Sequence, residues 1–221
     1  MKFIVSDDYG MQIRSAVLSQ IKNSDDALAD AEASAQTEME SYLRIKYDVA
    51  KIFAPVLLYD KALRYLIDQR IMLTAPAHNP ASTYVDKEIT LKDGLIYRAK
   101  AIVVAEAWTP AHWEVIDKVN ALWYVTAAQT TAGVVLDAEM SKGDTRYPVL
   151  LMYLKDMVIY HIFSNISAQN IPESRGKRYD AAIKWLNMVT TDKLSPDLPL
   201  APDQNHTQFK IGSNPKVTTG W

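Results

Sequence analysis

The clearest pattern of hydrophobic and polar positions lies between Gly143 and Leu194, where it predicts two helices joined by a short polar link. Apolar residues cover most of the circumference of the first helix, Pro148–Ser164, so we expect protein to enclose it on more than one side. The second helix begins near Pro172 and buries one face. The apolar positions are Leu150, Leu151, Leu154, Met157, Val158, Ile162 and Phe163 in the first helix, and Tyr179, Ala182, Ile183, Leu186 and Val189 in the second. The short link predicts an antiparallel helical hairpin.

Two further helices are predicted nearer the start of the chain. Ser6 or Asp8 can cap a short helix that continues to Ile21. A longer helix begins at the polar run of residues 24–26 and continues to about Tyr47. At 1.5 Å per residue it is about 35 Å long, which is enough to cross a small helical domain. Its apolar stripe consists of Leu28, Ala31, Ala35, Met39, Tyr42 and Leu43.

From about Ala54 the helical periodicity gives way to short β-type runs and recurring prolines. Residues 83–91 and 95–104 flank the turn Lys92-Asp93-Gly94, in which Gly94 can take a positive φ, so they predict a β-hairpin. Residues 64–73 weakly repeat the pattern of residues 83–91, and we expect two related strands. Residues 117–142 are irregular or β. The sequence therefore predicts a β-rich insert between two helical segments.

The fold class expected from these patterns is α+β. A helical domain is formed by residues 1–53 and 143–194, a small β-rich insert domain by residues 54–142, and an extended C-terminal tail by residues 195–221. Three prolines stop any helix in the tail, and its apolar content is too low for it to fold alone. Aromatic and apolar anchors in the tail are candidates for binding a neighbouring protein: Phe209, Ile211, Pro215 and Trp221.

Composition narrows the possible partners. The 221 residues include 24 Lys and Arg against 26 Asp and Glu, so no overall basic field favours nucleic acid or an acidic membrane. The absence of cysteine excludes disulfides, thiol nucleophiles and cysteine-ligated zinc. No apolar run approaches the roughly 20 residues of a membrane span, and the first residues contain no signal-peptide core. We expect a protein that is neither membrane-embedded nor secreted by that route.

Motifs for catalysis are also lacking. The sequence has no glycine-rich phosphate loop and no G-x-S-x-G motif. Helix capping explains the acidic pairs at residues 7–8 and 25–26 more simply than acid–base catalysis. Four histidines lack the spacing of metal ligands: His78, His112, His161 and His206. We therefore expect no enzyme activity, no metal and no cofactor.

Four ordered segments carry a resemblance to a known family. They are ALADAEASAQTEMESYLRIKYD, RYPVLLMYLKDMVIYHIF, NIPESRGKRYDAAIKWL and GSNPKVTTGW. Together they resemble the Mu-like head–tail adaptor family of tailed bacteriophages, and the last segment resembles the terminus of its Bacteroidetes-phage members. The likeness covers residues 1–53 and 143–221, so it implies a helical adaptor domain made of the long helix and the C-terminal helical hairpin.

The resemblance implies a structural virion protein, made in the host cytoplasm and placed at the neck between capsid and tail. Its expected partners are copies of itself in a closed ring, a dodecamer, together with the portal protein and a tail-side connector or stopper protein. Genomic DNA would pass through the channel without sequence-specific binding. A near-neutral chain is compatible with sliding DNA, because a strongly basic lumen would hold the phosphates.

The insert carries a second resemblance. YVDKEITLKDGLIYRAKAIVVAEAWTPAHWEVI is similar to small chitin-binding-type carbohydrate modules. Tyr97, Trp108 and Trp113 could then form a sugar-stacking surface. The alternative is that Tyr97 and Trp113 are the core of a module too small to have another. A carbohydrate-binding module on a helical carrier, for virion decoration or attachment to a host surface, is therefore the second hypothesis.

Overall fold

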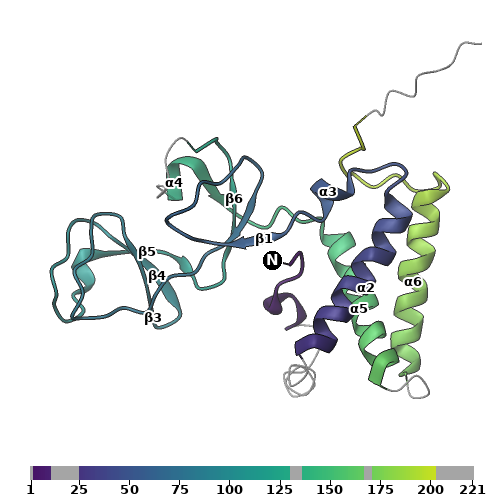
Figure 1. Ribbon diagram of the computed structural model, residues 1–221, viewed down its shortest axis with the longest axis horizontal. Coiled ribbons are helices and arrows are strands. Elements are labelled where there is room, and N and C mark those ends of the chain that lie inside the picture. Colours follow the sequence, from purple (N-terminus) through teal and green to yellow (C-terminus); the bar gives the residue numbers. More distant parts are fainter. Residues whose placement is uncertain (1, 11–24, 130–135, 167–170, 203–221) are drawn as a thin grey trace, which may run out of the picture.

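Residues 2–10, 25–129, 136–166 and 171–202 are described by the structure, a computed structural model of the chain. Helices gather at one end of the molecule and strands at the other (Figure 1). The chain passes from the helices to the strands after α3 and returns to the helices before α5. We call the two ends the helical bundle and the β region.

Three helices of similar length form the helical bundle (Figure 1). They are α2 (Asp25–Leu43), α5 (Pro148–Ile166) and α6 (Glu173–Thr190). α5 packs against both of the others, and its side chains Leu154, Met157 and Val158 are fully buried. This central position explains why apolar residues cover its circumference. Ala31 and Ala35 of α2 are also fully buried, and their small side chains let the helices approach closely.

Two short helices flank the bundle. The 3₁₀ helix η1 (Ser6–Tyr9) belongs to an N-terminal segment whose Phe3, Ile4 and Tyr9 are buried in the bundle core. The helix α3 (Val49–Ile52) is a single turn, and its N-cap residue Asp48 accepts a hydrogen bond from the backbone N–H of Lys51 at 3.1 Å. The chain enters the β region directly after α3.

The β region contains a four-stranded and a three-stranded sheet. The first has the order β1-β2-β6-β7, with β1 parallel to β2 and the other neighbours antiparallel. The second has the antiparallel order β3-β4-β5. The elements are β1 (Val56–Leu58), β2 (Arg70–Met72), β3 (Ile89–Lys92), β4 (Leu95–Ala99), η2 (Pro110–His112), β5 (Trp113–Lys118), β6 (Leu122–Val125), α4 (Leu136–Glu139) and β7 (Met140–Lys142).

The two sheets repeat one arrangement. We call residues 56–73 and 121–142 the first β-module, of which 130–135 lie outside the described residues, and residues 75–118 the second β-module. In each, a parallel pairing is followed by two antiparallel pairings at matching positions. The matching pairs are Leu58↔Met72 and Ala77↔Leu91, Ile71↔Trp123 and Thr90↔Tyr97, and Val125↔Met140 and Ala99↔Trp113.

Hydrogen bonds to a buried tyrosine repeat as well. The backbone N–H of Asp60 donates to the hydroxyl of Tyr65 at 2.5 Å, and that of Asn79 donates to the hydroxyl of Tyr84 at 2.6 Å. Positive φ angles occur at matching positions, 67° at Asp68 and 65° at Lys87. The weak sequence repeat of residues 64–73 and 83–91 is therefore part of a duplicated module.

The second β-module is nested inside the first. In the second, a two-residue turn of Asp93 and Gly94, with φ of 50° and 78°, joins the paired residues Lys92 and Leu95. The corresponding positions in the first are Leu73 and Ala121, where the N–H of Leu73 donates to the carbonyl of Ala121 at 2.8 Å. Residues 74–120 thus occupy the place of a hairpin turn.

The fold class expected from the sequence is wrong in its architecture, although the chain is mixed α+β. An adaptor domain built on one long helix is not present, because α2 ends at Leu43 and has 19 residues, as does α5. The helix stops where Tyr47 turns inward, is buried and pairs with Leu200. The insert is not one small module, since the described residues hold seven strands in two sheets. The tail beyond Pro202 lies outside the described residues.

Candidate functional site

A buried ionic cluster ties the N-terminal segment to the start of α5. Arg146, whose side chain is 1% exposed, donates to both carboxylate oxygens of Asp8 at 2.6 and 2.8 Å. It also donates to Asp144, with a shortest distance of 2.8 Å, and to the carbonyl of Phe3 at 2.8 Å. The cluster therefore fixes the point where the chain returns from the β region to the helical bundle.

The electrostatics keep this cluster ionised. Burial alone would raise the pKa of the Asp144 carboxyl, but hydrogen bonds and charge from Arg146 outweigh it, and the pKa falls below its ordinary value. Burial alone would lower the pKa of the Arg146 guanidinium, and the two carboxylates raise it instead. A fully paired cluster of this kind orients its neighbours and is costly to break.

A cavity of about 840 Å³ lies beside this cluster, where the helical bundle meets the β region. Its polar lining includes Arg70, Asp68, Gln69 and Thr145. Its apolar and aromatic lining includes Leu57, Ile67, Tyr124 and Tyr147. The volume lies within the range of small-molecule sites in proteins. Sequence reasoning missed this cavity because its walls come from segments far apart in the chain.

The three aromatic residues predicted from the sequence come together in the second β-module. Trp108 stacks on Trp113 with ring centroids 5.0 Å apart, and Tyr97 meets Trp108 edge-on at 4.7 Å. His78 and Tyr84 complete the cluster, and His78 stacks on Tyr84 at 5.4 Å. Sequence reasoning did not place these two residues in the cluster, although Tyr84 leads the repeated segment.

This geometry favours packing over sugar binding. Trp113 is 4% exposed, so neither of its ring faces is open to a ligand. Lys92 places its Nζ atom 4.9 Å from the ring centroid of Trp108. In the first β-module, Tyr59 stacks on Tyr65 with ring centroids 6.3 Å apart, at the positions that correspond to His78 and Tyr84. The cluster therefore occupies the position of a module core.

The candidate residues of the tail, Phe209, Ile211, Pro215 and Trp221, lie outside the described residues, as does His206. The other histidines make separate contacts: His112 lies 2.6 Å from Glu106 and His161 lies 2.9 Å from Glu38. The part of the chain that the structure describes contains no group of three or more residues able to hold a metal ion.

His161 belongs to a polar cluster that joins the three helices of the bundle. Glu38 of α2 accepts a hydrogen bond from the Tyr179 hydroxyl of α6 at 2.6 Å, and its other oxygen contacts His161 of α5. Burial and the Glu38 carboxylate raise the pKa of the Tyr179 hydroxyl. Tyr160 stacks on Tyr179 at 4.1 Å. The shared carboxylate orients the three helices relative to one another.

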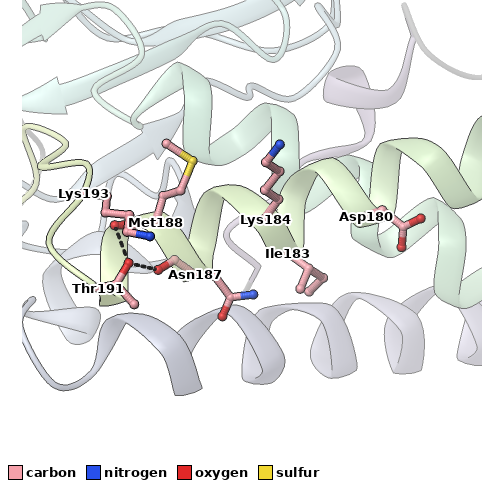
Figure 2. Close-up of a pocket in the computed structure, with 7 residues that line it drawn as sticks. All are labelled: Asp180, Ile183, Lys184, Asn187, Met188, Thr191 and Lys193. Atoms are coloured by element: carbon pink, nitrogen blue, oxygen red, sulfur yellow. Dashed lines mark hydrogen bonds between the residues drawn. The ribbon is translucent and has the colours of Figure 1, made fainter.

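A shallow groove of about 460 Å³ follows the outer side of α6 (Figure 2). Its lining comes from this helix and the residues just after it: Asp180, Ile183, Lys184, Asn187, Met188, Thr191 and Lys193. The Thr191 hydroxyl donates back to the carbonyl of Asn187 at 2.7 Å. Because one helix supplies the lining, no opposing side chains converge on a substrate. The groove is a surface that another protein chain can cover.

Exposed aliphatic side chains are frequent, particularly in the β region. The second β-module exposes Ile102 by 68% and Val104 by 64%, and the first exposes Leu66 by 69%. At the bundle end, Ile45 is 83% exposed and Leu200 is 65% exposed. Single exposed aliphatics are ordinary, whereas groups of them mark surfaces that other proteins cover.

No helix among the described residues is both long and apolar enough to cross a membrane. No family model, curated protein or solved structure matches the chain.

Proposed function

We propose that the chain is a structural subunit of a tailed-phage particle, a head–tail connector that forms a ring beneath the portal. Copies of the chain contact one another side to side, and the ring binds the portal protein on one side and a tail-side connector or stopper protein on the other. DNA passes through the central channel. The proposal starts from the four ordered segments that resemble the Mu-like adaptor family.

The observation that carries the proposal is the exposure of large aliphatic side chains at both ends of the molecule. A ring requires head-to-tail contacts in which two different faces of each subunit meet. Val85, Ile102 and Val104 supply one such face at the second β-module, where Tyr84 and Val103 pair and point their side chains inward. Ile45 and Leu200 supply another at the bundle. Contact with other chains would remove both faces from water.

The charge of the chain is also compatible with a DNA channel. With 24 basic and 26 acidic residues, the subunit carries a formal net charge of −2. A lumen made from such subunits releases few counterions when DNA enters, so the DNA is not held in place.

The experiment uses the purified chain with the portal protein encoded in the same genome. Sedimentation and negative-stain electron microscopy should show a ring attached to the portal. Ile102→Glu should weaken this assembly, because it places a charge in a contact that excludes water. Ser174→Glu adds the same charge at an exposed position in the first turn of α6, and it should assemble normally. A chain that stays monomeric with both the portal and the stopper protein would contradict the proposal.

A further inference from the structure

Arg70 is a buried arginine without a carboxylate partner. It is 7% exposed and lines the cavity of about 840 Å³ between the helical bundle and the β region, which we call the junction cavity. Its Nε donates to Thr145 Oγ1 at 3.1 Å, and its Nη1 donates to the carbonyls of Ile52 and Ala54 at 3.3 and 2.9 Å. Within the described residues, its Nη2 has no hydrogen-bond acceptor and no carboxylate oxygen lies within 4.0 Å of the guanidinium. The two N–H groups of Nη2 thus make no hydrogen bond to the part of the protein that the structure describes and are available to a ligand.

The strand itself does not need an arginine at this position. The matching residue of the second β-module is Ile89, which is 8% exposed. The duplicated module therefore folds with an aliphatic side chain there. The charge of Arg70 therefore belongs to the junction of the two regions, where the guanidinium also lies 5.6 Å from the ring centroid of Phe3.

The neighbouring charges do not satisfy Arg70. Lys51 lies 3.9 Å from Asp48 on the cavity rim, so these two offset each other. Asp144 is held by Arg146. Asp68 also lines the cavity without reaching the guanidinium. Burial accordingly lowers the pKa of Arg70, although an arginine stays protonated at neutral pH.

The charges that line the junction cavity determine which kind of anionic ligand it can bind. One unpaired guanidinium next to Asp68 suits a single negative charge and disfavours a polyanion. Leu57, Ile67, Tyr124 and Tyr147 offer apolar and aromatic surface to the remainder of the ligand. A carboxylate is the monoanion that guanidinium donors match best.

We propose that the junction cavity binds a carboxylate carried on an apolar or aromatic body, with the Nη2 group of Arg70 as the donor. The carboxylate belongs either to a small molecule or to an acidic side chain of another protein segment. The inference is independent of the connector ring, since a chain that forms no ring would still present the cavity.

The first test uses ligand-observed saturation-transfer NMR on the full chain, with phenylacetate as the probe and phenylacetamide as its neutral counterpart. Phenylacetate should bind saturably and phenylacetamide should not. Arg70→Gln should weaken phenylacetate binding by about tenfold or more, because a charge-assisted hydrogen bond is lost. Arg98→Gln is the matched control: Arg98 pairs with Glu114 at 2.7 Å in the second β-module, and its loss should leave binding unchanged.

A second variant keeps the test decisive if Arg70→Gln does not fold. Ile67 is 52% exposed and lines the cavity, so Ile67→Trp reduces the space while Arg70 itself stays unchanged. It should also abolish phenylacetate binding. The proposal is overturned if neither phenylacetate nor an aspartate-containing peptide binds, if phenylacetamide or inorganic phosphate binds as well as phenylacetate, or if Ile67→Trp leaves binding intact.

The two sources of the carboxylate are separated by a peptide arm. A blocked tripeptide with a central aspartate between two aromatic residues is compared with the same peptide carrying asparagine. Tighter binding of the aspartate peptide than of phenylacetate assigns the cavity to a protein segment. Tighter binding of phenylacetate assigns it to a small molecule. Failure of both probes rejects the site.

Discussion

The helical bundle holds one continuous core, whereas the β region holds two clusters, one shared by both modules and one confined to the second β-module. In the bundle, Leu154 and Met157 of α5 are fully buried between helices on both sides. In the β region, Trp123 belongs to the cluster that both modules share, and Trp113 belongs to a separate cluster within the second β-module. The bundle therefore gains stability from one large core, and the first β-module shares its main cluster with side chains of the second.

The two regions also differ in what they leave exposed. The second β-module exposes Val85, Ile102 and Val104 by more than half, while α6 exposes no large hydrophobic side chain beyond the 36% of Met188. The helical bundle therefore buries most of its large hydrophobic side chains, and the β region carries the larger share of exposed apolar surface. Four changes to the chain can break or sharpen this division.

The largest effect is expected at the connection between the regions. Arg146→Met should destabilise the protein by about 3 kcal/mol, because it leaves the largely buried carboxylate of Asp8, 12% exposed, without a cation, whereas Asp144, 36% exposed, can be solvated. Urea denaturation followed by circular dichroism measures the loss. A loss of less than about 1 kcal/mol would mean that the regions do not depend on this cluster.

A core substitution in the bundle should have nearly as large an effect. Leu154→Ala removes a fully buried side chain of α5 and should cost about 3 kcal/mol. Met152→Ala, on the same helix but 41% exposed, is the control and should cost about 0.5 kcal/mol or less. Equal losses in the two variants would show that α5 does not form the centre of the core.

Removal of the second β-module should hardly affect the bundle. Replacing residues 74–120 by Asp-Gly joins Leu73 to Ala121 with the turn that already joins Lys92 to Leu95. The helical signal should unfold with a free energy within about 0.5 kcal/mol of the full chain, because the two sites are distant. Ile89, Ile96 and Ile116 leave the shared cluster, so the first β-module should lose stability. Loss of the helical transition would refute the independence of the bundle.

The smallest effect is expected in the pH dependence of stability. The pKa of Asp144 is lowered in the folded protein, so its ionised form contributes stability above its ordinary pKa of about 4. That contribution is lost as the pH falls through the lowered value. Asp144→Asn should therefore be less stable than the parent chain near neutral pH, and the difference should shrink in acid. A difference that grows on acidification has the wrong sign for this account.

Local periodicity was enough to predict the helices of the bundle. The positions of α5 and α6 agree with the predicted segments, because a buried stripe at helical spacing is encoded within one stretch of sequence. The error concerned length. The helix was predicted to continue to about Tyr47, but it ends at Leu43, and Tyr47 enters the core from a turn and forms a bridge with Leu200. A contact between positions so far apart in the chain leaves no periodic signal.

The β region was less predictable for the same reason. The hairpin around Gly94 was found, since its turn signal is local. The pairing of β2 with β6 was missed, because the whole second β-module separates these strands. The repeat of residues 64–73 and 83–91 was a weak trace of the duplication. The correspondence between Tyr65 and Tyr84 became clear only from the structure, in which each hydroxyl accepts the same backbone hydrogen bond.

The candidate site was predictable in part. Tyr97, Trp108 and Trp113 were expected to lie together, and they do, although their rings cover one another. Arg70 carried no signal, because a single arginine in a short strand is unremarkable until its buried surroundings are known.

The most direct test of the connector proposal is electron cryo-microscopy of the assembled particle. The account predicts a closed ring of this chain at the vertex through which the genome leaves, with Val85, Ile102 and Val104 covered by a neighbouring chain. Copies that sit singly, away from that vertex, would contradict it.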